Sequence, residues 1–286
     1  MKISLLRAIL GGYFIVSGEV ALAQNESPQP VIATFKGTRF YNYHTTEIPA
    51  YRHLEFRVAH RFGDLRQGYE NFFGIDAGAV VRLSFGYAPF RWGEVGIERT
   101  GAGKWWNAYL KAKFLRQTAP HGIPVSVTWM SFIFFTEENN PSRYRSTIDR
   151  VEYLHQLLVA RKFSKRLSSL IGAALLHQNL ALAYNLPNTW FWLLTAVRFK
   201  VTHRIVLFME GAFPLWQRSL APNYQLPWSV GTEIETGGHV FQLGITTADG
   251  LSENRSLLTQ RPIMRVGFNI SRLFSLQGGP KYGTVD

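Results

Sequence analysis

The sequence predicts an all-β fold, an antiparallel transmembrane β-barrel of about 12 strands with an N-terminal periplasmic arm. Three observations support this prediction. Apolar and polar residues alternate in one segment after another, as they do when one face of a strand meets lipid and the other faces a lumen. Long and short connections between these segments alternate as well. The chain also contains 21 Phe, 12 Tyr and 8 Trp, which suits the aromatic girdles of membrane barrels.

The N-terminus has the features of a cleaved signal peptide over residues 1–23. Lys2 and Arg7 give a positive start, residues 8–20 are mostly apolar, and Ala21-Leu22-Ala23 offers a small-x-small cleavage site. The apolar run is too short and too interrupted to span a membrane, which takes about 20 residues. Residues 24–52 are expected to form an N-terminal periplasmic arm, which is loose over residues 24–33.

The barrel is expected over residues 53–272, followed by a C-terminal periplasmic tail at 273–286. In the second strand, Val81, Leu83 and Phe85 alternate with Arg82 and Ser84. Strands 123–135 and 167–177 are apolar on both faces, so their orientation stays open. The expected strands are 53–62, 78–88, 92–100, 104–117, 123–135, 151–163, 167–177, 190–200, 203–213, 226–235, 239–247 and 262–272.

The connection lengths indicate how the barrel lies in its membrane. A bacterial barrel has short periplasmic turns and long external loops, whereas a soluble β-sandwich, the other all-β fold that we considered, has no reason to alternate them. This pattern predicts location in the bacterial outer membrane, in contact with its lipid. The short connections are 89–91, 117–122, 164–166, 201–202 and 236–238; the long ones include 63–77, 137–150, 178–189, 214–225 and 248–261.

Charged residues in the polar phase of the strands are expected to line the lumen, because Arg or Lys on the lipid face costs about 2–4 kcal/mol at the membrane midplane. They would form either a basic pore that favours anions or a packed lumen closed by ion pairs. The expected lumen-lining residues are Arg57, Arg61, Arg82, Glu98, Lys111, Lys113, Arg198, Glu210, Glu233 and Arg265.

Composition limits the partners. The chain has 31 basic and 19 acidic residues, a formal net charge of +12. The basic residues are scattered singly, so we expect no nucleic-acid partner and favour lipid head groups or a small anionic solute. The absence of cysteine excludes disulfides and cysteine–zinc sites.

No motif for catalysis or metal binding stands out. The sequence contains no G-x-S-x-G nucleophile elbow, and the pairs His44/Glu47 and His53/Glu55 lack the spacing of H-E-x-x-H. We therefore expect neither a cofactor nor a metal site, and we expect that the protein is not an enzyme.

Several short segments carry a resemblance to a known family. FKGTR at 35–39, HRFGD at 60–64, NFFGID at 71–76 and the run 110–117 resemble a family of uncharacterised bacterial outer-membrane β-barrel proteins. The resemblance implies a leader and a barrel. It brings no assigned activity, and therefore no functional residues. The glycine-containing NFFG stretch either folds inward as a loop plug or forms an aromatic cap outside.

Two main functional hypotheses follow. The preferred one is passage or binding of a small anionic solute. The alternative is a non-conducting structural barrel that recruits a periplasmic or outer-membrane protein partner. An outer-membrane enzyme is the third and least favoured class.

Overall fold

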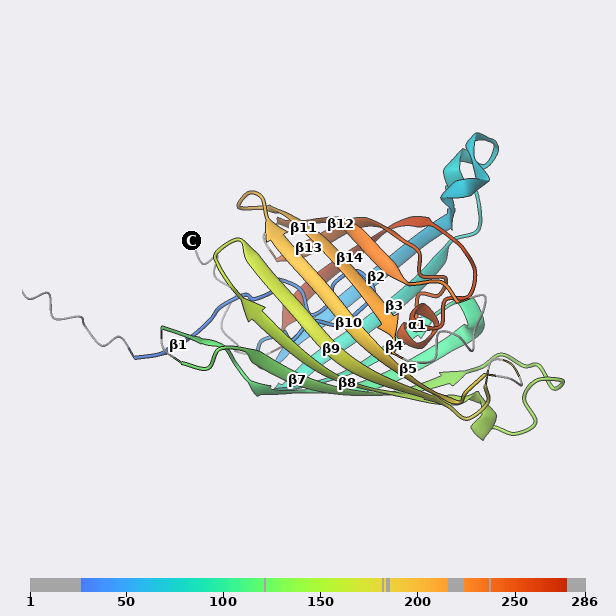
Figure 1. Cartoon of the computed structure of the whole chain (residues 1–286), viewed down its shortest axis with the longest axis horizontal. Coiled ribbons are helices and arrows are strands. Elements are labelled where there is room, and N and C mark those ends of the chain that lie inside the picture. Colours follow the sequence, from blue (N-terminus) through green and yellow to red (C-terminus); the bar gives the residue numbers. More distant parts are fainter. Residues whose placement is uncertain are drawn as a thin grey trace, which may run out of the picture.

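Twelve antiparallel strands close into one barrel (Figure 1). The structure, a computed structural model, describes residues 27–276 except 121, 182, 184–185, 216–223 and 237. The signal peptide expected at 1–23 lies outside the described residues. The barrel strands are β2 (His53–Asp64), β3 (Val80–Phe90), β4 (Gly93–Thr100), β5 (Trp105–Leu115), β7 (Ser126–Thr136), β8 (Val151–Lys162), β9 (Leu167–Gln178), β10 (Thr189–Lys200), β11 (Ile205–Pro214), β12 (Trp228–Thr236), β13 (His239–Thr246) and β14 (Arg265–Ser275).

Each barrel strand pairs with its neighbours along the chain, and β14 pairs with β2 to close the barrel. The closing register runs from Ser275↔His53 to Arg265↔Asp64. The predicted fold class is confirmed, and every predicted strand overlaps one of the twelve. The last strand shows the largest offset, because it ends at Ser275 rather than at 272. The expected tail therefore begins later, and its residues after 276 lie outside the described ones.

Burial alternates residue by residue along the strands. In β2, each inward residue from His53 to Gly63 is buried and each outward residue is partly exposed. The outer face carries apolar side chains that suit lipid, such as Leu83, Ile97 and Leu110. The structure also settles the two strands that are apolar on both faces: β7 turns Met130, Phe132 and Phe134 inward, and β9 turns Leu170, Ala174 and Leu176 inward.

The two ends of the barrel differ (Figure 1). The long connections lie at one end, together with helix α1 (Glu253–Leu257) and the short 3-10 turns η1 (Leu65–Gln67) and η2 (Tyr69–Gly74). The NFFG stretch in η2 projects away from the lumen, with Phe72 and Phe73 about half exposed, so it does not fold inward. No helix in the described residues is long and apolar enough to cross a membrane.

The N-terminal segment departs most from the sequence-based expectation. The short strand β1 (Gln29–Pro30) pairs with β6 (Thr118–Ala119) at the short-turn end. Residues 34–46, which we call the lumen segment, then enter the barrel, where all of them except Lys36 are buried. The assignment of residues 24–52 to a periplasmic arm outside the barrel is therefore wrong for this stretch. Its aromatic residues give the physical reason, because they are stabilised by burial.

Candidate functional site: a lumen occupied by two inward segments

The lumen segment forms a tight hairpin inside the barrel. Arg39 and His44 form an isolated antiparallel bridge, and the Phe40 amide donates to the Tyr43 carbonyl at 2.8 Å. A buried hairpin needs partners for its remaining backbone groups. Lumen-facing side chains supply them: the Lys111 ammonium donates to the Thr38 carbonyl at 3.2 Å, and Thr128, Asn269 and Gln242 donate to other carbonyls of the segment.

Tyr41 lies against two glycines, Gly244 and Gly267, which belong to a row of three that pair across neighbouring strands. Gly231 pairs with Gly244, and Gly244 pairs with Gly267. A Cβ on Gly244 would lie 3.2 Å from the Tyr41 ring, and one on Gly267 would lie 3.0 Å from its hydroxyl oxygen. The hydroxyl donates to the Gly244 carbonyl at 2.8 Å, and the Arg61 guanidinium stacks 3.5 Å from the ring centroid. The row of glycines therefore makes room for an aromatic ring.

Asn42 fixes the tip of the hairpin to the neighbouring strands β11 to β13. Its amide nitrogen donates to Ser229 at 2.8 Å and to Thr246 at 3.0 Å. Its backbone N–H donates to Glu210 at 2.8 Å, and the Tyr43 N–H donates to the same carboxylate at 3.3 Å. Charge-assisted bonds of this kind are stronger than neutral ones, so Glu210 anchors the hairpin tip.

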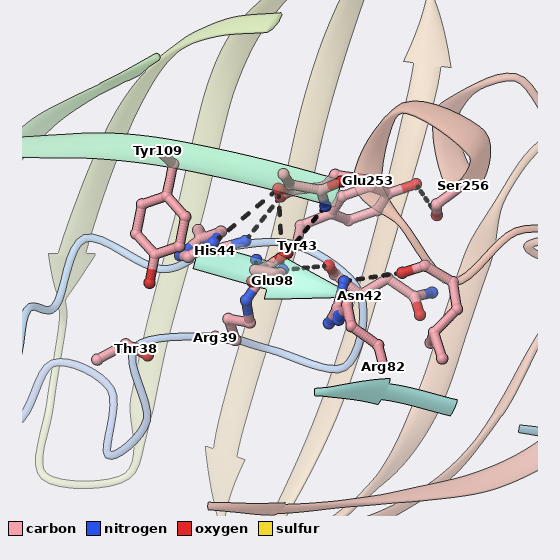
Figure 2. A network of polar contacts seen from close by, with 12 residues as sticks. Thr38, Arg39, Asn42, Tyr43, His44, Arg82, Glu98, Tyr109, Glu253 and Ser256 are labelled. Atoms are coloured by element: carbon pink, nitrogen blue, oxygen red, sulfur yellow. Dashed lines mark hydrogen bonds and ion pairs between the residues drawn. The ribbon is translucent and has the colours of Figure 1, made fainter. Parts of the chain in front are cut away.

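A second segment enters from the long-loop end. Residues 248–259, which we call the inward loop, contain α1 and are mostly buried. Glu253 meets the lumen segment directly (Figure 2): it accepts from the His44 backbone N–H at 3.3 Å and lies 3.8 Å from the Arg39 guanidinium. Arg39 also pairs with Glu98. The Tyr43 and Ser256 hydroxyls are 3.2 Å apart, so the two segments contact each other inside the barrel.

The contact between the segments includes two perturbed titratable groups outside the strands. Burial, together with the positive charge of Arg39, lowers the pKa of the His44 imidazole well below its ordinary value. Burial raises the pKa of the Glu253 carboxyl, although Arg39 opposes that shift. The His44 Nε2 and Glu253 Oε2 atoms lie 4.0 Å apart. His44 is therefore neutral near pH 7 in this arrangement.

The ten residues expected to line the lumen all lie on barrel strands and point inward. All are buried except Lys113 and Arg265, which are partly exposed. Most take part in ion pairs, which are Arg57–Glu55 at 2.7 Å, Lys113–Glu47 at 2.8 Å, Arg198–Glu233 at 3.5 Å, Lys111–Glu94 at 3.7 Å and Arg265–Asp249 at 3.7 Å.

Arg61 and Arg82 differ from the others. Among the described residues, neither guanidinium has a carboxylate within 4.0 Å, although both side chains are at most 2% exposed. Arg61 donates to the Tyr41 carbonyl at 2.9 Å and to the Asn42 side-chain oxygen at 3.1 Å. Arg82 donates to the Leu251 carbonyl at 2.7 Å. Two buried cations thus use neutral oxygens of the two inward segments as acceptors.

The opposite wall of the lumen, on β7 to β11, is mostly apolar, although Glu152, Arg198 and Glu210 also face inward there. It meets the aromatic side chains of the lumen segment, Phe35, Phe40 and Tyr43, in one cluster. The charged wall lies on β2 to β5 and β12 to β14. The apolar wall consists of Met130, Phe132, Phe134, Leu154, Leu158, Leu170, Leu176, Trp190, Trp192, Leu194 and Phe208.

Sequence reasoning missed three parts of this site. Glu94 lies in the same phase of β4 as Glu98, so alternation alone could have identified it. The aromatic residues of 34–46 were a signal against an arm outside the barrel. The inward loop carried no comparable signal, because its polar composition is that of an external loop. Among the described residues, no group of three or more His, Asp or Glu side chains has an arrangement that could hold a metal ion.

A family described as "Membrane bound beta barrel domain (DUF5777)" matches residues 35–274. The chain belongs to this family. The match begins at Phe35 and therefore includes the lumen segment as well as the barrel. This agrees with the resemblance found in the sequence. The family description carries no function. No curated protein matches the sequence significantly.

The barrel fold is also found in solved structures of porins. The NanC porin aligns with a TM-score of 0.50 and 9% sequence identity, covering 78% of this chain and 100% of that one. The KdgM porin in complex with disordered oligogalacturonate aligns with a TM-score of 0.49 and 8% sequence identity, covering 78% of this chain and 99% of that one. At such identities the likeness shows the fold alone. Together with the family description, it shows that this DUF5777 member is a membrane-bound β-barrel with the fold of a porin.

Proposed function

We propose that the protein is an outer-membrane channel for a small anionic solute, closed at rest by its lumen segment and inward loop. The pairing of Arg61 and Arg82 with neutral oxygens carries this proposal. A buried cation without a carboxylate partner is costly, and both guanidiniums lose acceptors when the two segments move. An anionic solute would supply new ones in the same place.

The lumen segment is the mobile element of this mechanism. Hydrogen bonds that involve side chains hold it in the lumen, and it is not paired with any strand of the barrel sheet. Its withdrawal leaves the strand pairing of all twelve strands intact. Electrostatic attraction by Arg57, Arg61, Arg82 and Lys111 would then lower the barrier for anions relative to cations.

A disulfide lock tests the closure. The natural chain has no cysteine, so Asn42→Cys/Ser229→Cys, whose parent side chains touch at 2.8 Å, gives one defined pair. Loss of the Asn42 contacts with Ser229 and Thr246 weakens closure, so we expect planar-bilayer conductance in dithiothreitol and its loss after oxidation, with recovery on reduction. Asn42→Cys alone is the matched control and should conduct under both conditions. Heat-modifiable gel migration shows that each variant has folded.

Anion selectivity tests the solute class. Reversal potentials in a salt gradient should show preference for anions, and Arg61→Gln and Arg82→Gln should each shift the reversal potential toward zero. Arg52→Gln, in the segment just before β2, is a comparison charge outside the lumen and should leave selectivity unchanged.

The filled lumen also favours a second candidate, the non-conducting structural barrel that recruits a protein partner. The same measurements decide between them. A correctly folded barrel that shows no conductance, with the cysteine pair reduced as well as oxidised, would refute the channel and support the structural barrel.

A further inference from the structure

We infer that the solute is an amphipathic anion, an organic acid with an aromatic or similarly sized apolar body. The two walls of the lumen carry this inference, which rests on the proposed function. The cationic wall presents Arg61 and Arg82, and the opposite wall on β7 to β11 presents large apolar side chains. A pore for a purely polar anion gains nothing from an apolar wall, because that wall offers no partner to replace lost hydration.

The lumen segment itself shows what this site accommodates. The Tyr41 ring lies 3.5 Å from the Arg61 guanidinium and 5.7 Å from the Phe208 ring, so one aromatic ring contacts both walls. The oxygens beside it, the Tyr41 carbonyl and the Asn42 side-chain oxygen, accept from Arg61. The segment therefore places a ring and oxygen acceptors where the solute's apolar body and acid group would bind.

The apolar wall contains polar atoms that have no partner in this arrangement. The indole N–H groups of Trp190 and Trp192 and both amide atoms of Gln156 are buried and form no hydrogen bond with the described residues. All three side chains are at most 1% exposed and point into the lumen. Buried donors without acceptors are costly. A solute with a polar substituent on its apolar body would satisfy them.

Competition between solute and lumen segment provides the test. Thr46 is fully buried and its hydroxyl has no hydrogen-bond partner among the described residues, so Thr46→Cys is a reporter that loses no side-chain hydrogen bond. In the folded full chain, reaction of this cysteine with a water-soluble maleimide measures release of the segment. The probes are 4-phenylbutyrate, acetate as the anion without a ring, and 4-phenyl-1-butanol as the ring without a charge.

We expect 4-phenylbutyrate to raise the labelling rate about tenfold, equivalent to about 1.4 kcal/mol of preference for the released form. Acetate and 4-phenyl-1-butanol should change it less than about twofold. Trp192→Phe in the reporter background should reduce the response to 4-phenylbutyrate. The matched control Trp129→Phe, on the outward face of β7, should leave it unchanged.

The contrary outcomes are distinct. Equal responses to acetate and 4-phenylbutyrate would overturn the inference and leave an anion site without an apolar component. Equal responses to 4-phenyl-1-butanol and 4-phenylbutyrate would show that the solute need not be an anion, which would overturn the inference. The absence of a response to all three probes would also overturn it. Conductance of the reduced Asn42→Cys/Ser229→Cys variant tests the channel itself, so failure of the inference and failure of the proposed function give different results.

Discussion

At the residue scale, glycines at inward-facing positions of the strands leave space in the lumen for aromatic rings. Gly231, Gly244 and Gly267 form a cross-strand row in which Gly244 and Gly267 lie under Tyr41, and Gly96 similarly lies under the ring of Tyr109. Alternation identifies these positions as inward. It cannot show that an aromatic ring from elsewhere in the chain occupies the space.

Gly244→Ala tests this cradle. The added Cβ would lie 2.9 Å from the Val230 carbonyl oxygen and 3.2 Å from the Tyr41 ring, and such overpacking typically costs about 1–3 kcal/mol. The contact with Tyr41 exists only in the closed form, so we expect faster labelling of Thr46→Cys. Gly78→Ala, where an added Cβ meets nothing within 4 Å, is the control. Equal rates for the two variants would show that the cradle does not hold the segment.

His44 gives the closed form a dependence on pH. Its pKa is lowered when buried and returns to about 6.5 on release. Below about pH 6.5 the released form therefore binds a proton that the closed form does not, so acidification favours release. Glu253 acts in the opposite direction, because its pKa is raised in the closed form and protonation there favours closure.

A comparison of the Thr46→Cys reporter with and without His44→Gln isolates the histidine, since Glu253, Arg39 and Lys111 are present in both. We expect the labelling rate to rise more steeply with His44 than without it between about pH 7.5 and about pH 5.5. Parallel pH profiles would exclude His44 as the source of the pH dependence.

At the scale of the element, each strand has one face toward lipid and one toward the lumen. A charged substitution should therefore be tolerated on the lumen face and not on the lipid face. Leu243 on β13 is 57% exposed on the outer face, and its neighbour Gln242 faces the lumen and is buried. The lumen-facing neighbour contacts polar groups of β12 and β14. Only the outward position should require an apolar side chain.

Leu243→Arg tests where this part of β13 lies across the thickness of the membrane. An arginine on the lipid face near the midplane costs about 2–4 kcal/mol, and the cost falls toward zero near the interface. We expect a marked loss of heat-modifiable folded barrel for Leu243→Arg. Phe274→Arg, near the end of β14, should fold almost as the wild type does. Equal yields for both substitutions would contradict the placement of the lipid band.

At the scale of the whole molecule, the barrel has one end with long loops and another with short turns, β1 and the described C-terminal residues (Figure 1). In an outer-membrane barrel the long loops face the exterior. The lumen segment then enters from the periplasmic side and the inward loop from the outside, so the closure involves both faces of the membrane.

Single cysteines test this orientation. Arg145→Cys lies in an exposed part of a long connection and Lys165→Cys in an exposed short turn. On intact cells, a membrane-impermeant maleimide should label the first and leave the second unlabelled. Both should react after lysis. The reverse labelling pattern would invert the barrel and the direction of entry of both segments.

The sequence by itself determined the barrel, its number of strands and the inward residues of β2 to β5. These follow from alternation and connection length, which are local properties. The tertiary structure alone decided that residues 34–46 fill the lumen, that β7 to β11 supply an apolar wall, and that Arg61 and Arg82 have neutral acceptors. The physical reason is the distance along the chain: contacts such as Tyr41 with Gly244 join residues 203 positions apart, and no local pattern records which distant residues share a lumen.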